Sequence, residues 1–224
     1  MSVSVLFVVG LATAVFVGVN VGGSSTGVAF GPATGSGVLS MRAASALMAV
    51  FVFAGGLAVG PAVVDTLGTD FVPAEYFTLG ASIGVLLFIG VGILLGNILR
   101  VSVGTSQTAV GAVVGMGAAL GVLDWRVVGE VVTWWVVSAI AAFWIAAVVG
   151  RYCYDRIAAV LDFQAEGRRR LGQVLTVGVG CYMAFSAGAS NVANAVAPLV
   201  GSGQLTMTPG VLVGAAAIGA GAFA

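Results

Sequence analysis

The chain has no histidine and no lysine, and its 224 residues include only eight arginines and eight acidic residues. Without histidine it lacks the commonest proton shuttle and metal ligand. The formal net charge of zero gives no indication of a nucleic-acid partner. Cys153 and Cys181 lack the spacing of a metal or redox motif, so we expect them to be ordinary small apolar residues. We therefore expect no cofactor.

Hydrophobic residues make up 60% of the chain and charged residues only 7%, and the mean hydropathy is +1.15. A soluble domain carries about 25% charged residues. Apolar runs of about 20 residues indicate helices that cross a bilayer. No base precedes Arg42, so the first run is interpreted as a mature span rather than a signal peptide. The sequence predicts an all-α polytopic membrane protein with crossings at 3–20, 43–64, 78–99, 104–122, 128–150 and 171–187, and another beginning at 210.

The arginines are distributed unevenly along the chain. Arg42 and Arg100 fall on one side of the membrane if these crossings are right, whereas the acidic 65–75 segment falls on the other. The positive-inside rule then places the 151–170 loop in the cytoplasm and the amino terminus outside the cell membrane. That loop holds five of the eight arginines, namely Arg151, Arg156, Arg168, Arg169 and Arg170.

A weak internal repeat links residues 22–37, GGSSTGVAFGPATGSG, with residues 188–203, GASNVANAVAPLVGSG. Both copies are polar, proline-interrupted segments of small residues in a very hydrophobic chain. Paired interruptions of this kind point to the binding site of a secondary transporter. The identities are Gly22/Gly188, Ser24/Ser190, Ala29/Ala195, Pro32/Pro198, Gly35/Gly201, Ser36/Ser202, Gly37/Gly203, Leu39/Leu205 and Met41/Met207.

Each copy is predicted to form a re-entrant helical hairpin, over about 22–40 and about 188–208. The expected breaks are near Gly31-Pro32 and Ala197-Pro198. Irregular backbone at membrane depth is tolerated only inside protein or against a water-filled cavity. Five crossings separate the copies, and an odd number inverts the second copy. The prediction is an inverted-topology repeat, which lets one central site face either side of the membrane.

Neutral polar side chains in three segments form the predicted site. Four of them would cap the broken helices, whose free N–H groups attract anions. Amides buried in hydrocarbon are costly without a purpose, and residues 105–108 supply more donors than one helix cap needs. For the small residues at 35–37 and 201–203 we favour close helix packing instead. The candidates are the capping residues Ser24, Ser25, Ser190 and Asn191, together with Asn194, Thr105, Ser106 and Gln107.

No Asp, Glu or His falls within the expected crossings, apart from Glu130 near the start of its span. This argues against a carboxylate proton relay. Neutral donors and helix ends suit an oxyanion better than a metal ion. Because the sequence has no nucleophile–base pair, metal cluster or Walker-type loop, an enzyme is not expected.

These segments resemble the inorganic phosphate transporter (PiT) family, which also includes sulfate permeases. Residues 188–195, GASNVANA, are similar to the family's duplicated signature G-A-N-D-V-A-N-A, of which the first copy keeps only the ends. Residues 35–42, GSGVLSMR, are similar to the continuation G-S-G-A-L-T-L-R. Residues 103–115, VGTSQTAVGAVVG, are similar to the helix P-V-S-T-T-H-A-I-V-G-A-I-I-G.

The resemblance implies sodium- or proton-coupled phosphate uptake, with the anion bound near the midplane by the two hairpins and the Ser/Thr helices. All eight candidates above are then anion contacts, and Asn191 and Asn194 are also candidate weak sodium ligands. Ser25 and Asn191 replace the two signature aspartates. Since neutral side chains do not repel a dianion, sulfate or another oxyanion stays open as the substrate, and sodium coupling is in question.

Members of that family have a complete second half, whereas this chain stops at Ala224 within an apolar run. The expected organisation is a first repeat over 1–150, the loop at 151–170, and the start of a second repeat over 171–224. A fragment or truncated product is expected, and a non-transporting paralogue or partner subunit is an open alternative. A homo-oligomer also stays open, because apolar faces toward lipid and toward a partner look alike.

Overall fold

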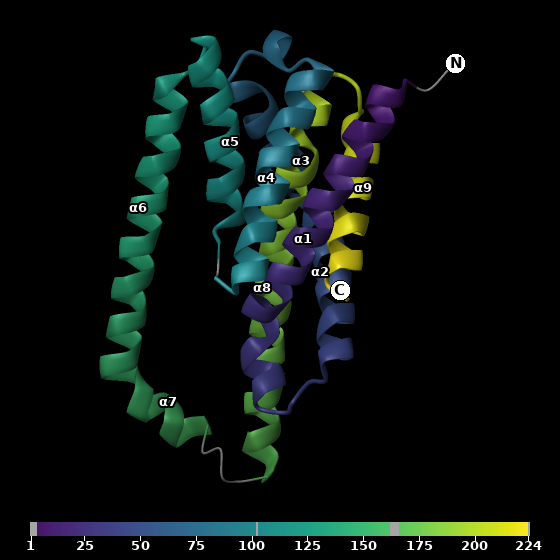
Figure 1. Ribbon diagram of the computed structural model, residues 1–224. Coiled ribbons are helices and arrows are strands. Elements are labelled where there is room, and N and C mark those ends of the chain that lie inside the picture. Colours follow the sequence, from purple (N-terminus) through teal and green to yellow (C-terminus); the bar gives the residue numbers. More distant parts are fainter. Residues whose placement is uncertain (1–3, 102, 162–165, 224) are drawn as a thin grey trace.

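In the computed structural model, which describes residues 4–101, 103–161 and 166–223, all regular structure is helical. The longer helices run roughly along one direction (Figure 1). Five segments are long and apolar enough to cross a membrane: Val5–Gly35, Met41–Ala58, Leu79–Leu99, Trp125–Ala159 and Arg169–Gly201. The helices are α1 (Val5–Gly35), α2 (Met41–Ala58), α3 (Gly60–Asp65), α4 (Leu79–Leu99), α5 (Thr105–Leu120), α6 (Trp125–Val148), α7 (Tyr154–Leu161), α8 (Glu166–Gly201) and α9 (Met207–Gly221). The predicted all-α membrane class is confirmed.

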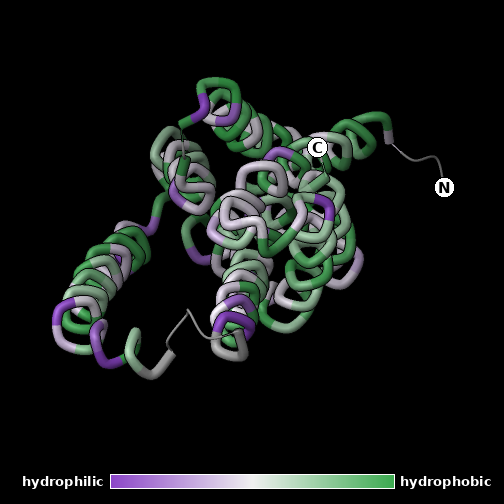
Figure 2. The backbone as a smooth tube through the Cα atoms, turned by 90° about the horizontal axis from the view of Figure 1, so that it is seen from below, coloured by the Kyte–Doolittle hydropathy of each residue, from purple (hydrophilic) through white to green (hydrophobic). Residues whose placement is uncertain are grey.

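The core of the bundle is formed by α1, α2, α4, α8 and α9, whereas α6 stands to one side (Figure 1). Val17, Met48, Leu86 and Leu199 are fully buried in this core. Helix α6 has no fully buried residue, and most of its large apolar side chains are exposed. The view from below shows hydrophobic residues, in green, around the outside of the bundle and along α6 (Figure 2). Apolar exterior of this kind fits a lipid solvent rather than water.

The predicted breaks at Pro32 and Pro198 are wrong, because both prolines lie inside continuous helices, α1 and α8. A proline removes only one helical N–H, and nearby hydroxyls add bonds to other carbonyl oxygens of the same helices. Thr34 Oγ1 donates to the Phe30 carbonyl oxygen at 3.0 Å, and Ser82 Oγ of α4 donates to the Pro198 carbonyl oxygen at 2.6 Å. The turns come a few residues later, so each copy is a long helix followed by a second helix.

The two turns have the same hydrogen bonds. Leu39 N–H donates to Ala33 O, and its counterpart Leu205 N–H donates to Leu199 O. Gly37 and Gly203 occupy the left-handed region at φ +72° and +69°, where glycine is the favoured residue. The local structure of the repeat is therefore duplicated, although only part of its sequence is.

The helix pairs α1–α2 and α8–α9 turn at opposite ends of the molecule (Figure 1). The two pairs also contact each other symmetrically: the closest glycine contacts of one copy are repeated by the equivalent residues of the other copy, 166 positions away. A Cβ on Gly22 would collide with the Ile218 backbone oxygen, and one on its counterpart Gly188 would collide with the oxygen of Val52. Gly55 and Gly221 meet the backbones of Phe185 and Val19 in the same reciprocal way. Small residues thus let these four helices pack at backbone distance.

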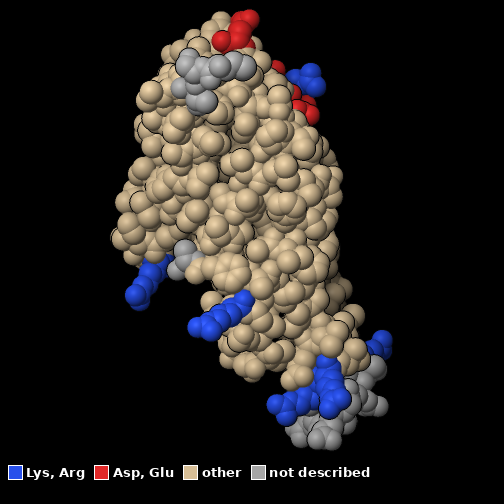
Figure 3. Space-filling model, turned by 90° about the vertical axis from the view of Figure 1, so that its right-hand side faces the viewer, with Lys and Arg blue, Asp and Glu red and all other residues tan. Residues whose placement is uncertain are grey.

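Charged side chains gather at the two ends of the bundle (Figure 3). The acidic 65–75 segment lies at the upper end, and α7 and the start of α8 lie at the lower end (Figure 1). The 151–170 segment was predicted to be a loop, but residues 154–161 form α7, and 149–153 form a π-helical turn. Residues 162–165 lie outside the described part of the chain. The assignment of the lower end to the cytoplasm stays a prediction.

Candidate functional site

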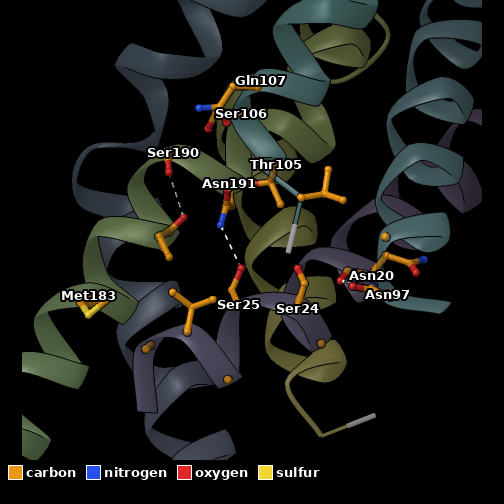
Figure 4. A pocket seen from close by; sticks show the side chains of 18 of the residues that line it. Asn20, Ser24, Ser25, Asn97, Thr105, Ser106, Gln107, Met183, Ser190 and Asn191 are labelled. Carbon is orange, nitrogen blue, oxygen red and sulfur yellow. Dashed lines mark hydrogen bonds between the residues drawn. The ribbon is translucent and has the colours of Figure 1, made fainter. Parts of the chain in front are cut away.

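A cavity of about 950 Å³ opens between α1, α4, α5 and α8, and Trp135 of α6 also contributes to its lining. Seven of the eight predicted site residues line it, from three helices far apart in the sequence (Figure 4). They are Ser24 and Ser25 of α1, Thr105, Ser106 and Gln107 of α5, and Ser190 and Asn191 of α8.

Asn191 joins the three helices through its carboxamide (Figure 4). Its Oδ1 accepts a hydrogen bond from Thr105 Oγ1 at 2.8 Å, and its Nδ2 donates to Ser25 Oγ at 3.3 Å. Asn191 is only 5% exposed, so these partners satisfy a group that would be expensive to leave unpaired. Ser25 and Asn191 are also counterparts in the repeat, 166 residues apart. Because two equivalent residues bond to each other, this contact lies where the two copies of the repeat meet.

Asn194 is the one predicted site residue that does not line the cavity. It lies directly behind the lining, only 1% exposed. Its Nδ2 donates to Asn191 Oδ1 at 3.2 Å and lies 3.5 Å from Ser106 Oγ. Its Oδ1 is the one buried side-chain polar atom in the described residues without a partner. Asn194 therefore orients Asn191 and offers one free oxygen.

The predicted capping role of Ser24, Ser25, Ser190 and Asn191 is wrong, because all four lie inside long helices. The Ser24 hydroxyl donates to the carbonyl oxygen of Val21, and that of Ser190 to Ser186. Hydroxyls in a helix interior commonly bond back to the preceding turn in this way. The helix ends expected at these positions do not exist.

A different helix end faces the cavity, namely the amino terminus of α5. Its N-cap residue Gly104 has no side chain to cap the first turn, and no side-chain cap bond is present there. Gly104, Thr105, Ser106 and Gln107 all line the cavity. Unpaired N–H groups at a helix start carry partial positive charge and attract anions. A Cβ at position 104 would meet the end of the exposed Gln107 side chain, which would have to move aside.

Sequence reasoning missed several lining residues, among them Asn20, Asn97 and Arg100. Asn97 Nδ2 donates to the Asn20 carbonyl oxygen at 3.1 Å, which ties α4 to α1 beside the cavity. An amide within an apolar span, as at Asn97, is itself a signal of function. From the sequence, Arg100 indicated only the orientation of the chain in the membrane. It ends α4 in the left-handed region at φ 55° and ψ 34°, a conformation that costs a residue with a side chain about 1–2 kcal/mol.

The electrostatics of the cavity favour anions. Arg100 is the single charged residue among those that line it, and no carboxylate does. The rest of the polar lining consists of hydroxyls, amides and the start of α5. No cluster of three or more His, Cys, Asp or Glu side chains that could hold a metal ion occurs in the described ranges. The site can thus offer many hydrogen-bond donors and net positive potential to a small oxyanion.

Spanning helices around a polar central cavity define an integral membrane protein of the transporter type. Residues 21–224 match the phosphate transporter family, so the chain belongs to that family. The sulfate permease CysP of Bacillus subtilis is 35% identical over 210 residues, which cover 93% of this chain and 58% of that protein. A putative phosphate permease of Chlamydia pneumoniae is 32% identical over 121 residues, which cover 50% of this chain and 28% of that protein.

Among solved structures, a sodium-dependent phosphate transporter has the same fold. The TM-score is 0.79 at 16% sequence identity, covering 98% of this chain and 75% of that one. The chain spans only about half the length of the curated relatives it matches, or less. The resemblance to the PiT family, inferred from the signature segments, is confirmed.

Proposed function

We propose that this chain forms the anion-binding half of a secondary permease for a tetrahedral inorganic oxyanion. The observation that carries this proposal is the hydrogen-bonded group Ser25, Thr105, Asn191 and Asn194, at a cavity that no carboxylate lines. Ser24, Ser106, Gln107 and Ser190 supply further hydroxyls and an amide around the same space. The family membership and the names of the relatives support the same class.

Sulfate fits this lining better than phosphate does. Phosphate carries one or two protons near neutral pH, and each P–O–H needs an acceptor, which an aspartate at either signature position would supply. Sulfate needs donors only, and Ser25 and Asn191 stand where the family signature has aspartate. The 35% identical relative is a sulfate permease, whereas the family description and the neighbouring structure favour phosphate as the second candidate.

The coupling ion is the next part of the proposal. The unpartnered Asn194 Oδ1 is a hard oxygen ligand of the kind that a sodium ion accepts. Asn191 Oδ1 already accepts two hydrogen bonds, from Thr105 and Asn194, so it has less to offer a cation. Sodium symport through Asn194 is thus favoured over a proton, for which the cavity lining has no carboxylate to serve as a carrier.

Alternating access is the proposed mechanism. The pairs α1–α2 and α8–α9 exchange equivalent glycine contacts and turn at opposite ends. Two such interlocked copies can rock against each other about the Ser25–Asn191 contact and expose the site to either side. The expected place is the cell membrane, with residues 151–170 in the cytoplasm. The first repeat is 1–150, and 171–224 begins the second; a homo-oligomer is not required.

The test is uptake of radiolabelled sulfate and phosphate into proteoliposomes that contain the complete gene product, with and without a sodium gradient. We expect sulfate uptake that unlabelled sulfate blocks more strongly than phosphate does, and stimulation by sodium. Phosphate-dominated uptake would support the second candidate. Uptake of neither anion would overturn the permease and favour a non-transporting paralogue or partner subunit.

A further inference from the structure

Arg100 stands at the edge of the cavity, apart from the polar group around Asn191. The connection between α4 and α5, to which it belongs, ends short of the lower ends of α1, α2 and α8 (Figure 1). Arg100 ends α4, lines the cavity and has an exposed side chain. Asn97 and Asn20 lie beside each other on a different side of the cavity from Asn191 (Figure 4).

The charge of Arg100 faces the cavity without a carboxylate partner. The single ion pair among the described residues joins Arg126 and Glu130, which belong to α6, and Arg100 is exposed. A guanidinium binds oxyanions through parallel N–H donors. One unpaired positive charge on the lining of a cavity also concentrates anions locally.

The backbone of Arg100 is unusual as well. It is the one residue other than glycine with positive φ among the described residues. A strained conformation at a site that lines a cavity is a reason to look for a function. Glycine or asparagine would adopt this conformation with less strain. Substitutions can therefore separate the effect of the arginine charge from the effect of the strained backbone.

We propose that Arg100 forms an entry site for the oxyanion at the mouth of the cavity on the side that the arginines assign to the cytoplasm, with Asn97 as a neighbouring neutral donor. An anion that exchanges with the solution on this side passes Arg100 on its way to or from Ser25, Thr105 and Asn191. The inference rests on the proposed permease function and adds to it a residue that determines charge selectivity and the rate of capture. An entry site of this kind governs apparent affinity and salt dependence more than the maximal rate.

The experiment compares Arg100→Asn, Arg100→Lys and Arg42→Gln in the complete gene product. Arg100→Asn removes the charge and tolerates the left-handed backbone, whereas Arg100→Lys keeps both the charge and the strain. Arg42 starts α2 and does not line the cavity, so Arg42→Gln controls for loss of any arginine. Initial rates of sulfate and phosphate uptake are measured over a range of anion concentration and of inert salt, in proteoliposomes whose protein has the Arg100 side facing the added anion.

For Arg100→Asn we expect KM to rise about tenfold with a maximal rate within about twofold of the wild type, and with uptake that no longer falls as salt rises. For Arg100→Lys we expect KM within about threefold of the wild type, and no change for Arg42→Gln. An unchanged KM in Arg100→Asn overturns the inference. Equal losses in Arg100→Asn and Arg100→Lys also overturn it, because they assign the effect to geometry rather than charge.

A binding measurement separates this inference from the permease itself. If the wild type transports neither anion, the proposed function fails, and sulfate- or phosphate-dependent thermal stabilisation of the purified protein then tests Arg100 directly. Stabilisation that Arg100→Asn loses and Arg100→Lys keeps supports an anion site at Arg100. Stabilisation that survives in Arg100→Asn, or is absent from the wild type, overturns it.

Discussion

Ser25 in the first copy of the repeat and Asn191 in the second are counterparts that hydrogen-bond to each other, yet their surroundings differ. Asn191 also holds Thr105 and is itself held by Asn194, whereas the counterpart of Asn194 in the first copy is Val28. The turns and glycine contacts of the two copies match closely. The backbone packing is therefore matched between the two copies, while the polar chemistry is concentrated in the second.

The largest effect is expected from breaking the packing that the copies share. Gly22→Ala and Gly188→Ala each place a Cβ against an opposing backbone oxygen that cannot move aside. Overpacking of this kind typically costs about 1–3 kcal/mol, and occasionally more. Both variants should lower the thermal unfolding temperature of the purified protein by similar amounts. Gly31→Ala is the control, because no atom lies within 4 Å of its added Cβ. Unequal losses would contradict the equivalence of the two copies.

The next effect separates the copies by their chemistry. Asn191→Ala removes the acceptor of Thr105 and the shorter of the two contacts of Asn194, and an unsatisfied buried group costs about 1–3 kcal/mol. We expect anion uptake to fall roughly 5- to 150-fold, and Ser25→Ala, which removes one weaker contact, to reduce it less. Ser138→Ala on the exposed face of α6 should change nothing. The asymmetry between the copies would be refuted by Ser25→Ala proving the more harmful change.

Restoring a carboxylate should alter selectivity. Asn191→Asp and Ser25→Asp introduce the signature residue into each copy in turn. Unit like charges at about 4 Å repel by about 4 kcal/mol at an effective dielectric constant near 20, so sulfate uptake should fall more than tenfold. Phosphate uptake should fall less, since a carboxylate can accept its proton. The measurement is the ratio of sulfate to phosphate uptake, and an unchanged ratio in both variants would count against the choice of sulfate.

The smallest effect is expected at the proline of the second copy. Ser82→Ala removes the hydroxyl that donates to the Pro198 carbonyl oxygen, a bond worth about 1 kcal/mol. Only α8 receives this support from another helix, because Thr34, near Pro32, bonds within α1. A small drop in unfolding temperature is expected, with Thr34→Ala as the comparison. No drop in Ser82→Ala would show that α8 does not depend on this bond.

The sequence predicted the spans well where apolar runs end in clear signals. The run at 78–99 became α4 (Leu79–Leu99), and 128–150 corresponds to α6 (Trp125–Val148). Hydropathy could not decide whether Pro32 and Pro198 break their helices. The outcome depends on packing against helices that lie far away in the sequence, such as α4, whose Ser82 bonds to the Pro198 carbonyl oxygen. The local preference of proline to end a helix predicted a break at each position, but both helices continue through their proline in the packed structure.

The candidate site was predicted by residue but not by mechanism. Polar residues in apolar surroundings identified Ser25, Thr105 and Asn191 correctly as neighbours. The same reasoning assigned helix ends to Ser24 and Ser190 that do not exist. Arg100 was missed because its place on the cavity lining depends on where α4 ends and how α5 packs, which a count of crossings does not give. The polar residues of the site could be identified from their apolar sequence surroundings. Their positions within the helices required the packed structure.

The most direct test of the cavity as the anion site is protection of a single cysteine. Cys153→Ser and Cys181→Ala remove the two natural thiols, and Ser25→Cys or Ser138→Cys then adds one thiol in the cavity or on α6. Reaction with a water-soluble maleimide is timed with and without sulfate or phosphate. Sulfate should slow labelling of the Ser25→Cys protein severalfold and leave the Ser138→Cys protein unaffected. Equal rates in the Ser25→Cys protein with and without either anion would contradict an oxyanion site between Ser25, Thr105 and Asn191.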